Sequence, residues 1–212
     1  LGGATDTLTK PFQVAGAAMA AGAVASAKFA IDFENNFADV RKTVDGTDEQ
    51  LNKIKQDIID MTTVGINGHS AIPQTTAELT ELAAAGGQLG IQTENISGFT
   101  ETMAMMGSAT NLAGEEGAKT LARFMNVANV SQGEVQNLGS SIVDLGNHFA
   151  TTEAEIAAMA QRMGATGTAV GISAQDILAY STALSSLGVE AEAGGSSISR
   201  IWMDIQTQVS TG

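Results

Sequence analysis

Apolar residues recur every three or four positions along most of the chain, which places them on one face of a helix. The pattern is present in five stretches: Leu51, Ile54, Ile58 and Met61; Ile96, Phe99, Met103 and Met106; Val135, Leu138, Ile142 and Leu145; Ile177, Tyr180, Leu184 and Leu187; and Ile198, Ile201, Trp202, Ile205 and Val209. No stretch alternates apolar and polar residues for long enough to predict a strand. The pattern therefore predicts an all-α fold.

Sequences typical of helix starts precede most of these stretches. A Ser or Thr followed three residues later by Glu or Gln forms a capping box, in which each side chain binds the other residue's backbone amide. Four pairs have this form: Thr47 with Gln50, Thr75 with Glu78, Ser131 with Glu134, and Thr152 with Glu155. Ser173 followed by Asp176 is a weaker version. Glycine-containing segments predict helix breaks at residues 65–73, 86–90, 107–117, 164–171 and 188–195.

These signals predict two parts. Residues 1–40 form a long Ala/Gly-rich N-terminal helix, with a helical pattern from about Thr5 to Val40. Residues 41–212 form a compact bundle or array of seven or eight shorter helices, because they are broken too often for a continuous coiled coil. No repeat of fixed period is evident. The chain stops directly after a helical pattern, so we expect it to be a fragment of a longer one.

The final apolar stripe, from Ile198 to Val209, contains the only tryptophan, Trp202. Two interpretations are open. In the first, the stripe closes the core by packing on the helix at residues 177–187. In the second, it is exposed here and is buried by another copy or by downstream chain. The first is preferred because an exposed stripe promotes aggregation.

Composition narrows the function. The formal net charge is −13, so we expect no direct tight binding of nucleic acid by this segment. Cysteine is absent, which removes disulfides, thiolate metal sites and cysteine nucleophiles. Aromatic residues make up only 4%, so the core is predicted to consist of aliphatic side chains and methionine.

Residues 12–31 are long enough to span a bilayer as a helix. They are mostly Ala and Gly, however, and they include Lys28, so they gain little free energy from entering lipid. A helix that packs closely through its small residues is the preferred prediction, and membrane contact through residues 12–31 is the alternative.

The residues that carry catalysis are few. His69 and His148 are the only histidines, and a zinc site needs three or four converging ligands. Glu115 with Glu116 and Glu153 with Glu155 lie at helix starts, where the helix dipole favours acids without any catalysis. The methionines at 103, 105, 106, 125, 159 and 163 are predicted to fill the core, in preference to forming a soft-metal site or an adaptable partner surface. We therefore expect that the protein is not an enzyme and has no catalytic residue. We also expect no metal site, no cofactor-binding residue and hence no cofactor.

Two long runs resemble a known family: GSSIVDLGNHFATTEAEIAAMAQRM at 139–163 and GISAQDILAYSTALSSLGVEAEAGGSSISRI at 171–201. They are similar to the core region of tail tape measure proteins of long-tailed phages and prophages, especially those of Gram-positive bacteria. Residues 33–51 and 81–118 resemble the same family, in the same order, and the similarity begins at about Gly16. The string at 189–197 is its most specific part.

The resemblance implies a role and no catalytic site. Tape measure proteins are structural virion components that lie in the tail lumen, set tail length during assembly in the host cytoplasm, and leave ahead of the DNA during ejection. The implied partners are the tail tube protein, tail assembly chaperones and tail-tip or baseplate proteins, together with self-association. The alternative is a membrane-interacting segment of the DNA-delivery channel. Because helix breaks recur throughout, the segment is predicted to be a folded module attached to the ruler.

Overall fold

The computed structural model describes residues 28–66 and 72–211, and every regular element in these ranges is helical. A helical segment at 28–43 comes first. The α-helices that follow are α2 (Asp48–Thr63), α3 (Thr76–Gln88), α4 (Ile96–Ala109), α5 (Gly114–Val127), α6 (Val135–His148), α7 (Glu153–Ala169), α8 (Ala174–Ser186) and α9 (Ala191–Thr211). Two short 3-10 helices, η1 (Thr93–Asn95) and η2 (Gln132–Glu134), precede α4 and α6. The prediction of an all-α fold is confirmed.

The predicted Ala/Gly-rich helix lies mostly outside the described residues. Its last part, 28–40, is helical and continues to residue 43. Phe33, Phe37 and Val40 of this segment are buried in the common core, so it packs as part of the array.

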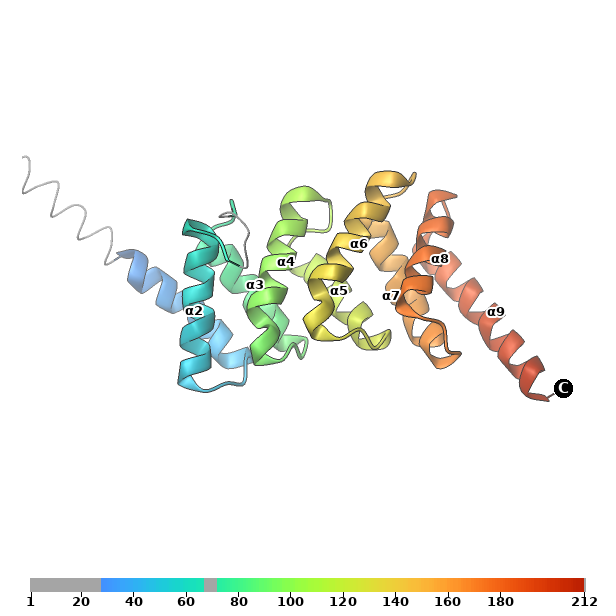
Figure 1. Ribbon diagram of the computed structural model, residues 1–212, viewed down its shortest axis with the longest axis horizontal. Coiled ribbons are helices and arrows are strands. Elements are labelled where there is room, and N and C mark those ends of the chain that lie inside the picture. Colours follow the sequence, from blue (N-terminus) through green and yellow to red (C-terminus); the bar gives the residue numbers. More distant parts are fainter. Residues whose placement is uncertain (1–27, 67–71, 212) are drawn as a thin grey trace, which may run out of the picture.

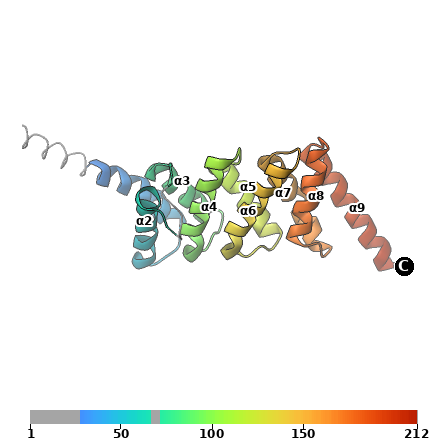
Figure 2. The same cartoon turned by 45° about the horizontal axis from the view of Figure 1, so that its top comes forward.

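The helices follow one another along the long axis of the molecule, as an array rather than a bundle (Figures 1 and 2). Helices α3, α5, α7 and α9 pack side by side in chain order and form one layer. Helices α2, α4, α6 and α8 form the second layer in the same way. Each layer covers the apolar stripe of the other, and this arrangement is typical of α-solenoid proteins, which stack pairs of helices.

The first layer repeats with a constant register. Helices α3, α5, α7 and α9 begin at Thr76, Gly114, Glu153 and Ala191, which are 38 or 39 residues apart. The expectation that no repeat of fixed period exists was therefore wrong. The residues in the fourth position of these helices differ too much to show the repeat: they are Leu79, Gly117, Ile156 and Gly194.

The turns between α3 and α4, α5 and α6, and α7 and α8 share one geometry. A residue with positive φ ends the first helix of each pair: Gly90 (82°), Asn129 (53°) or Gly171 (83°). The next amide then donates to a carbonyl in the last turn of that helix, at 2.8–3.0 Å. This is the Schellman type of helix end, which glycine and asparagine favour because they tolerate positive φ.

Side chains link consecutive turns of the array. The Thr93 hydroxyl donates to the Asp45 carbonyl at 2.5 Å. One turn later, Gln132 accepts from the Gln92 amide at 2.7 Å and donates to the Gly90 carbonyl at 3.0 Å. These bonds satisfy backbone groups that the turns leave free, and they fix the spacing of neighbouring hairpins.

Each of the five predicted helix breaks contains residues that lie between helices, but all except the first also reach into the helices themselves. The glycines at 86, 87, 107, 117, 164, 167, 194 and 195 lie inside α-helices. Their role is close packing: a Cβ at Gly164 would lie 2.5 Å from Val127, and one at Gly167 would lie 2.9 Å from Ile177. The predicted bounds were too wide because a glycine required by a neighbouring helix looks the same in sequence as one required by a turn.

Three of the four predicted capping boxes are present, at Thr47, Thr75 and Thr152, and Ser173 also caps its helix. The box predicted at Ser131 was wrong, because its hydroxyl makes no cap hydrogen bond. Ser131 is followed by the 3-10 helix η2, and α6 begins only after Glu134. The two residues therefore do not flank the first turn of an α-helix, which the capping box requires.

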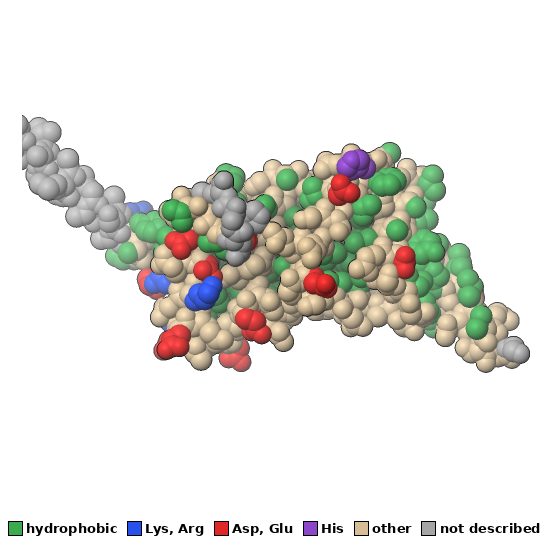
Figure 3. All heavy atoms as spheres, in the orientation of Figure 1, with side chains coloured by type: hydrophobic (Ala, Val, Ile, Leu, Met, Phe, Trp, Pro, Cys, Tyr) green, Lys and Arg blue, Asp and Glu red, His purple; other side chains and the backbone are tan. Residues whose placement is uncertain are grey.

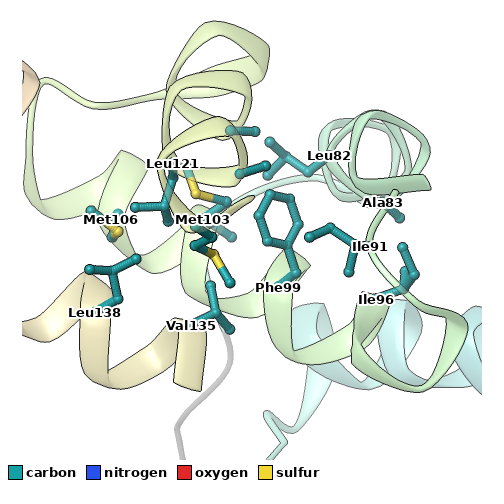
Figure 4. Packing of buried hydrophobic residues seen from close by; sticks show 14 of the residues in the cluster. Leu82, Ala83, Ile91, Ile96, Phe99, Met103, Met106, Leu121, Val135 and Leu138 are labelled. Atoms are coloured by element: carbon teal, nitrogen blue, oxygen red, sulfur yellow. The ribbon is translucent and has the colours of Figure 1, made fainter. Parts of the chain in front are cut away.

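The core runs through the array without interruption (Figure 4). Phe99 and Met103 of α4 lie between Leu82 of α3 and Leu121 of α5 in this view, and α6 closes the cluster with Val135 and Leu138. The methionines at 103, 106, 125, 159 and 163 are buried, as the sequence predicted, whereas Met105 is exposed.

Candidate interaction surface

The described residues contain no group of three or more His, Asp or Glu side chains arranged to hold a metal ion. His148 lies at the exposed end of α6, where its Nδ1 is 2.8 Å from the Asp144 carbonyl oxygen and 3.2 Å from the Asp144 carboxylate. His69 lies outside the described residues. Nothing around His148 supplies the converging ligands or the enclosed pocket of a site.

The paired acids act at helix starts. Glu155 completes the capping box of α7, and its hydrogen bonds with the backbone and hydroxyl of Thr152 lower its pKa. Glu115 and Glu116 both bind Lys119, at 2.8 and 3.0 Å. The hydrogen bond from Glu115, followed by that from Glu116, raises the pKa of Lys119. These contacts give Glu115, Glu116 and Glu155 structural partners.

The cations between Arg41 and Lys55 are engaged within the first hairpin. Lys42 pairs with Asp39 at 2.8 Å, and Lys53 pairs with Asp57 at 2.7 Å. Lys55 pairs with Glu34, and the Arg41 guanidinium lies 5.7 Å from the centre of the Phe37 ring. Because each positive charge has an intramolecular partner, the segment offers little free basic surface for phosphates.

Of the described helices, α9 carries the largest number of exposed large apolar residues. The C-terminal half of this helix extends past the rest of the array, and hydrophobic side chains line its open side (Figures 1 and 3). Its exposed apolar residues, with exposed fractions of 50–75%, are Ile201, Met203, Ile205 and Val209. We call Ile201 and Ile205 the α9 face. Apolar residues gathered on a regular helix side are typical of surfaces that another helix covers.

The first half of the same helix is attached to the core. Gly194 and Gly195 are buried against Met159 and Arg162 of α7. Ile198 and Trp202 are half-buried, and the Trp202 ring meets Tyr180 of α8 edge-on, with 5.6 Å between ring centres. The sequence interpretation in which the whole stripe closes the core on the helix at residues 177–187 was therefore wrong. Helix α9 packs chiefly on α7, and its second half is exposed because none of the described helices covers it.

A second open surface lies between α4 and α6. A groove there has a volume of about 410 Å³ and is lined by Met105, Met106, Gly139 and Val143 together with polar residues. A Cβ on Gly139 would lie 2.9 Å from the Met106 sulfur, which shows how closely the two helices pack beneath the groove. The sequence did not reveal it, because Met105 and Val143 lie outside the predicted stripes.

At the other end of the array, Phe29 and Ile31 are exposed on the segment 28–43, and Phe29 stacks on Phe33 with 6.0 Å between ring centres. The region 12–31, singled out for membrane contact, lies mostly outside the described residues. Among the described helices, none combines the length and hydropathy that crossing a bilayer requires.

Most of this chain is similar in sequence to known proteins. Residues 55–211 match the family model described as phage-related minor tail protein. Over 171 residues the chain is 23% identical to a protein named "Probable tape measure protein" from Halomonas phage phiHAP-1, an alignment that covers 77% of this chain. The chain spans about a fifth of the length of that relative, or 20%. No solved structure matches the chain significantly.

Proposed function

Because this chain belongs to the phage-related minor tail protein family, we propose that it is a segment of a tape measure protein that sets tail length during assembly and leaves ahead of the DNA during ejection. The observation that carries the proposal is the family match over residues 55–211, supported by the named tape measure relative. The role is structural, and we propose that this segment performs no catalysis.

The geometry favours a folded module over a measuring rod. A continuous helix advances by about 1.5 Å per residue, so the residues of one hairpin would span about 60 Å as a rod. Packed helices lie about 8–10 Å apart, so adding one hairpin lengthens a two-layer array by only about 10 Å. A ruler built in this way would use several times more residues for the same length. We therefore assign the measuring function to other parts of the polypeptide.

Partners follow from the same role. Inside a tail the segment would meet the tail tube protein, and at the ends of the tail it would meet tail-tip or baseplate proteins; assembly chaperones would hold it before the tube forms. Self-association belongs to the same proposal. The groove between α4 and α6 and the α9 face are exposed surfaces available for such contacts. The acidic net charge and the paired cations weigh against tight DNA binding.

Removing one hairpin from the gene in its phage tests the module assignment. Deleting residues 114–152 removes α5 and α6 and joins Ala113 to Glu153, so that α7 starts in the register of α5. We expect tails of unchanged length in electron micrographs. Tails shorter by about 60 Å would contradict the module assignment, because a rod loses about 1.5 Å per deleted residue.

A second measurement separates this result from simple misfolding. The purified deletion variant is expected to keep a helical far-ultraviolet circular dichroism spectrum, since repeat arrays tolerate the loss of an internal unit. To test the wider proposal, the same phage is depleted of the whole protein. Tails of uncontrolled length, or no tails, are expected, and normal tails of uniform length would refute the length-setting role.

A further inference from the structure

The register of the first layer shows what is missing from α9. Counting from the helix starts, the eleventh residue is Met163 in α7 and Ile201 in α9, and the fifteenth is Gly167 in α7 and Ile205 in α9. Met163 has no exposed surface, and Gly167 is buried. Their counterparts Ile201 and Ile205 are 50% and 56% exposed. A neighbouring helix therefore covers these two positions in α7, whereas the equivalent positions in α9 are exposed.

The neighbour that covers these positions in α7 is α8. The Ser181 hydroxyl of α8 lies 3.9 Å from the Met163 sulfur, and a Cβ on Gly167 would lie 2.9 Å from the Ile177 side chain of α8 and 3.0 Å from the Trp202 ring of α9. The same relation holds two repeats earlier in this layer: a Cβ on Gly86, the eleventh residue of α3, would meet Phe99 and Ile96 of α4. In these two hairpins the helix that follows in the chain supplies the cover, whereas α5 packs chiefly on its layer neighbours α7 and α3.

We infer that the α9 face is the docking surface for the second helix of a further hairpin, which continues the same polypeptide and packs antiparallel to α9 as α8 packs on α7. This occupant continues an interface that the array already uses. It also explains why α9 carries isoleucines at positions that would otherwise face water. A second copy of the chain is the less economical occupant, because it would have to reproduce from outside a contact that the array makes internally.

The structure also specifies the chemistry of the covering helix. It must present apolar or small buried side chains with helical spacing, as α8 does with Ile177 and Ser181 and as α4 does with Ile96 and Phe99. Where α7 has Gly167 opposite Ile177, α9 has the larger Ile205. The covering helix therefore requires a smaller residue than isoleucine at that point, such as Gly, Ala or Ser, for the two helices to approach equally closely.

The absence of cysteine makes a direct test clean. In the complete polypeptide encoded by the gene, Ile201→Cys is labelled with a benzophenone maleimide, irradiated and digested, and the cross-linked peptide is identified by mass spectrometry. The control is Thr207→Cys on the same half of α9. Thr207 has the register of Ala169, which stays exposed in α7 although its neighbours are all present. Circular dichroism checks that both variants fold.

The expected result is a cross-link from position 201 to a downstream segment of the same polypeptide with the described stripe, at a yield well above that from position 207. Three results would overturn the inference. They are a cross-link to a second copy, which mixed isotopic labelling distinguishes; a cross-link to a different tail protein in assembled particles; and a yield at position 201 no higher than at position 207, including the case in which no chain follows.

Discussion

Helices α7 and α9 begin in the same register and belong to the same layer, yet they have opposite environments. Helix α7 has α5 and α9 beside it and α8 across from it, and it buries Ile156, Ala160 and Met163. Helix α9 has α7 beside it, and the only residues it buries are Gly194 and Gly195. The difference shows that burial in this fold is a property of the neighbouring hairpins, and that one apolar pattern yields a core or a surface according to them.

The largest difference in stability is expected when the eleventh residue of α5, α7 or α9 is truncated. Phe124 of α5 and Met163 of α7 are fully buried, so Phe124→Ala should lower the free energy of unfolding by about 3–5 kcal/mol and Met163→Ala by about 2–5 kcal/mol. Ile201→Ala, at a half-exposed position, should cost about 1 kcal/mol or less. Urea unfolding of the three variants gives these values. Equal losses at positions 124 and 201 would contradict the assigned environments.

A smaller effect is expected where helices approach through glycine. A Cβ on Gly164 would lie 2.5 Å from Val127, so Gly164→Ala forces the α5 side chain to move. The gain in helix propensity of about 1 kcal/mol does not offset overpacking of about 1–3 kcal/mol, and a net loss of about 1 kcal/mol follows. Gly98 of α4 has open space around it, so Gly98→Ala should stabilise by up to about 1 kcal/mol. Opposite shifts in thermal melting temperature are the expected outcome; stabilisation by both changes would mean that α5 and α7 lie further apart.

The first turns of two helices in this layer also differ, because α7 has a capping box and α5 has none. Thr152→Ala removes the hydroxyl that accepts a hydrogen bond from the Glu155 backbone amide, and it should lower the free energy of unfolding by about 1 kcal/mol. The N-cap of α5 is Ala113, which is extended and exposed. Ala113→Ser should therefore stabilise by up to about 1 kcal/mol. Paired melts of the two variants measure both effects, and a neutral Ala113→Ser would show that another group already satisfies these amides.

The smallest expected effect is on pH dependence. Hydrogen bonds from Thr152 lower the pKa of Glu155, and those from Thr75 lower the pKa of Glu78 in the same way. A lowered folded-state pKa contributes stability that is present above the ordinary pKa of glutamate and is lost as the pH falls through the folded-state value. The melting temperature of the parent chain should consequently drop slightly more on acidification than that of a Glu78→Gln, Glu155→Gln double variant. Identical pH profiles would contradict the claim that the charged carboxylates of Glu78 and Glu155 stabilise the two capping boxes.

Local features of the fold could be predicted from the sequence. The stripe at Leu51, Ile54, Ile58 and Met61 and the one at Ile96, Phe99, Met103 and Met106 are buried throughout, because helical spacing determines which residues share a face. The capping boxes at Thr47, Thr75 and Thr152 depend on neighbouring residues alone, and they formed as predicted. Ser131 failed because the 3-10 turn η2 intervenes.

What depends on neighbouring helices could not be predicted. Gly164 looked like a helix break, yet it is a contact point whose partner, Val127, lies on another helix. The repeat was hidden because Gly117 and Ile156 fill one structural position with side chains of very different size. The stripe from Ile198 to Val209 was recognised, but helical spacing alone does not say which neighbours exist. Its division into a packed half and an exposed half therefore required the structure.

The central claim is that α9 belongs to the array but lacks the helix that would pack on its exposed face. Residue-by-residue amide hydrogen exchange on the chain of 212 residues tests this claim most directly. We predict that amides around Met163 in α7 exchange only through global unfolding, whereas those after Trp202 in α9 exchange orders of magnitude faster through local opening. The rates should not change on dilution, because no second copy supplies the cover. Equal protection of the two helices in the monomeric chain would contradict this account.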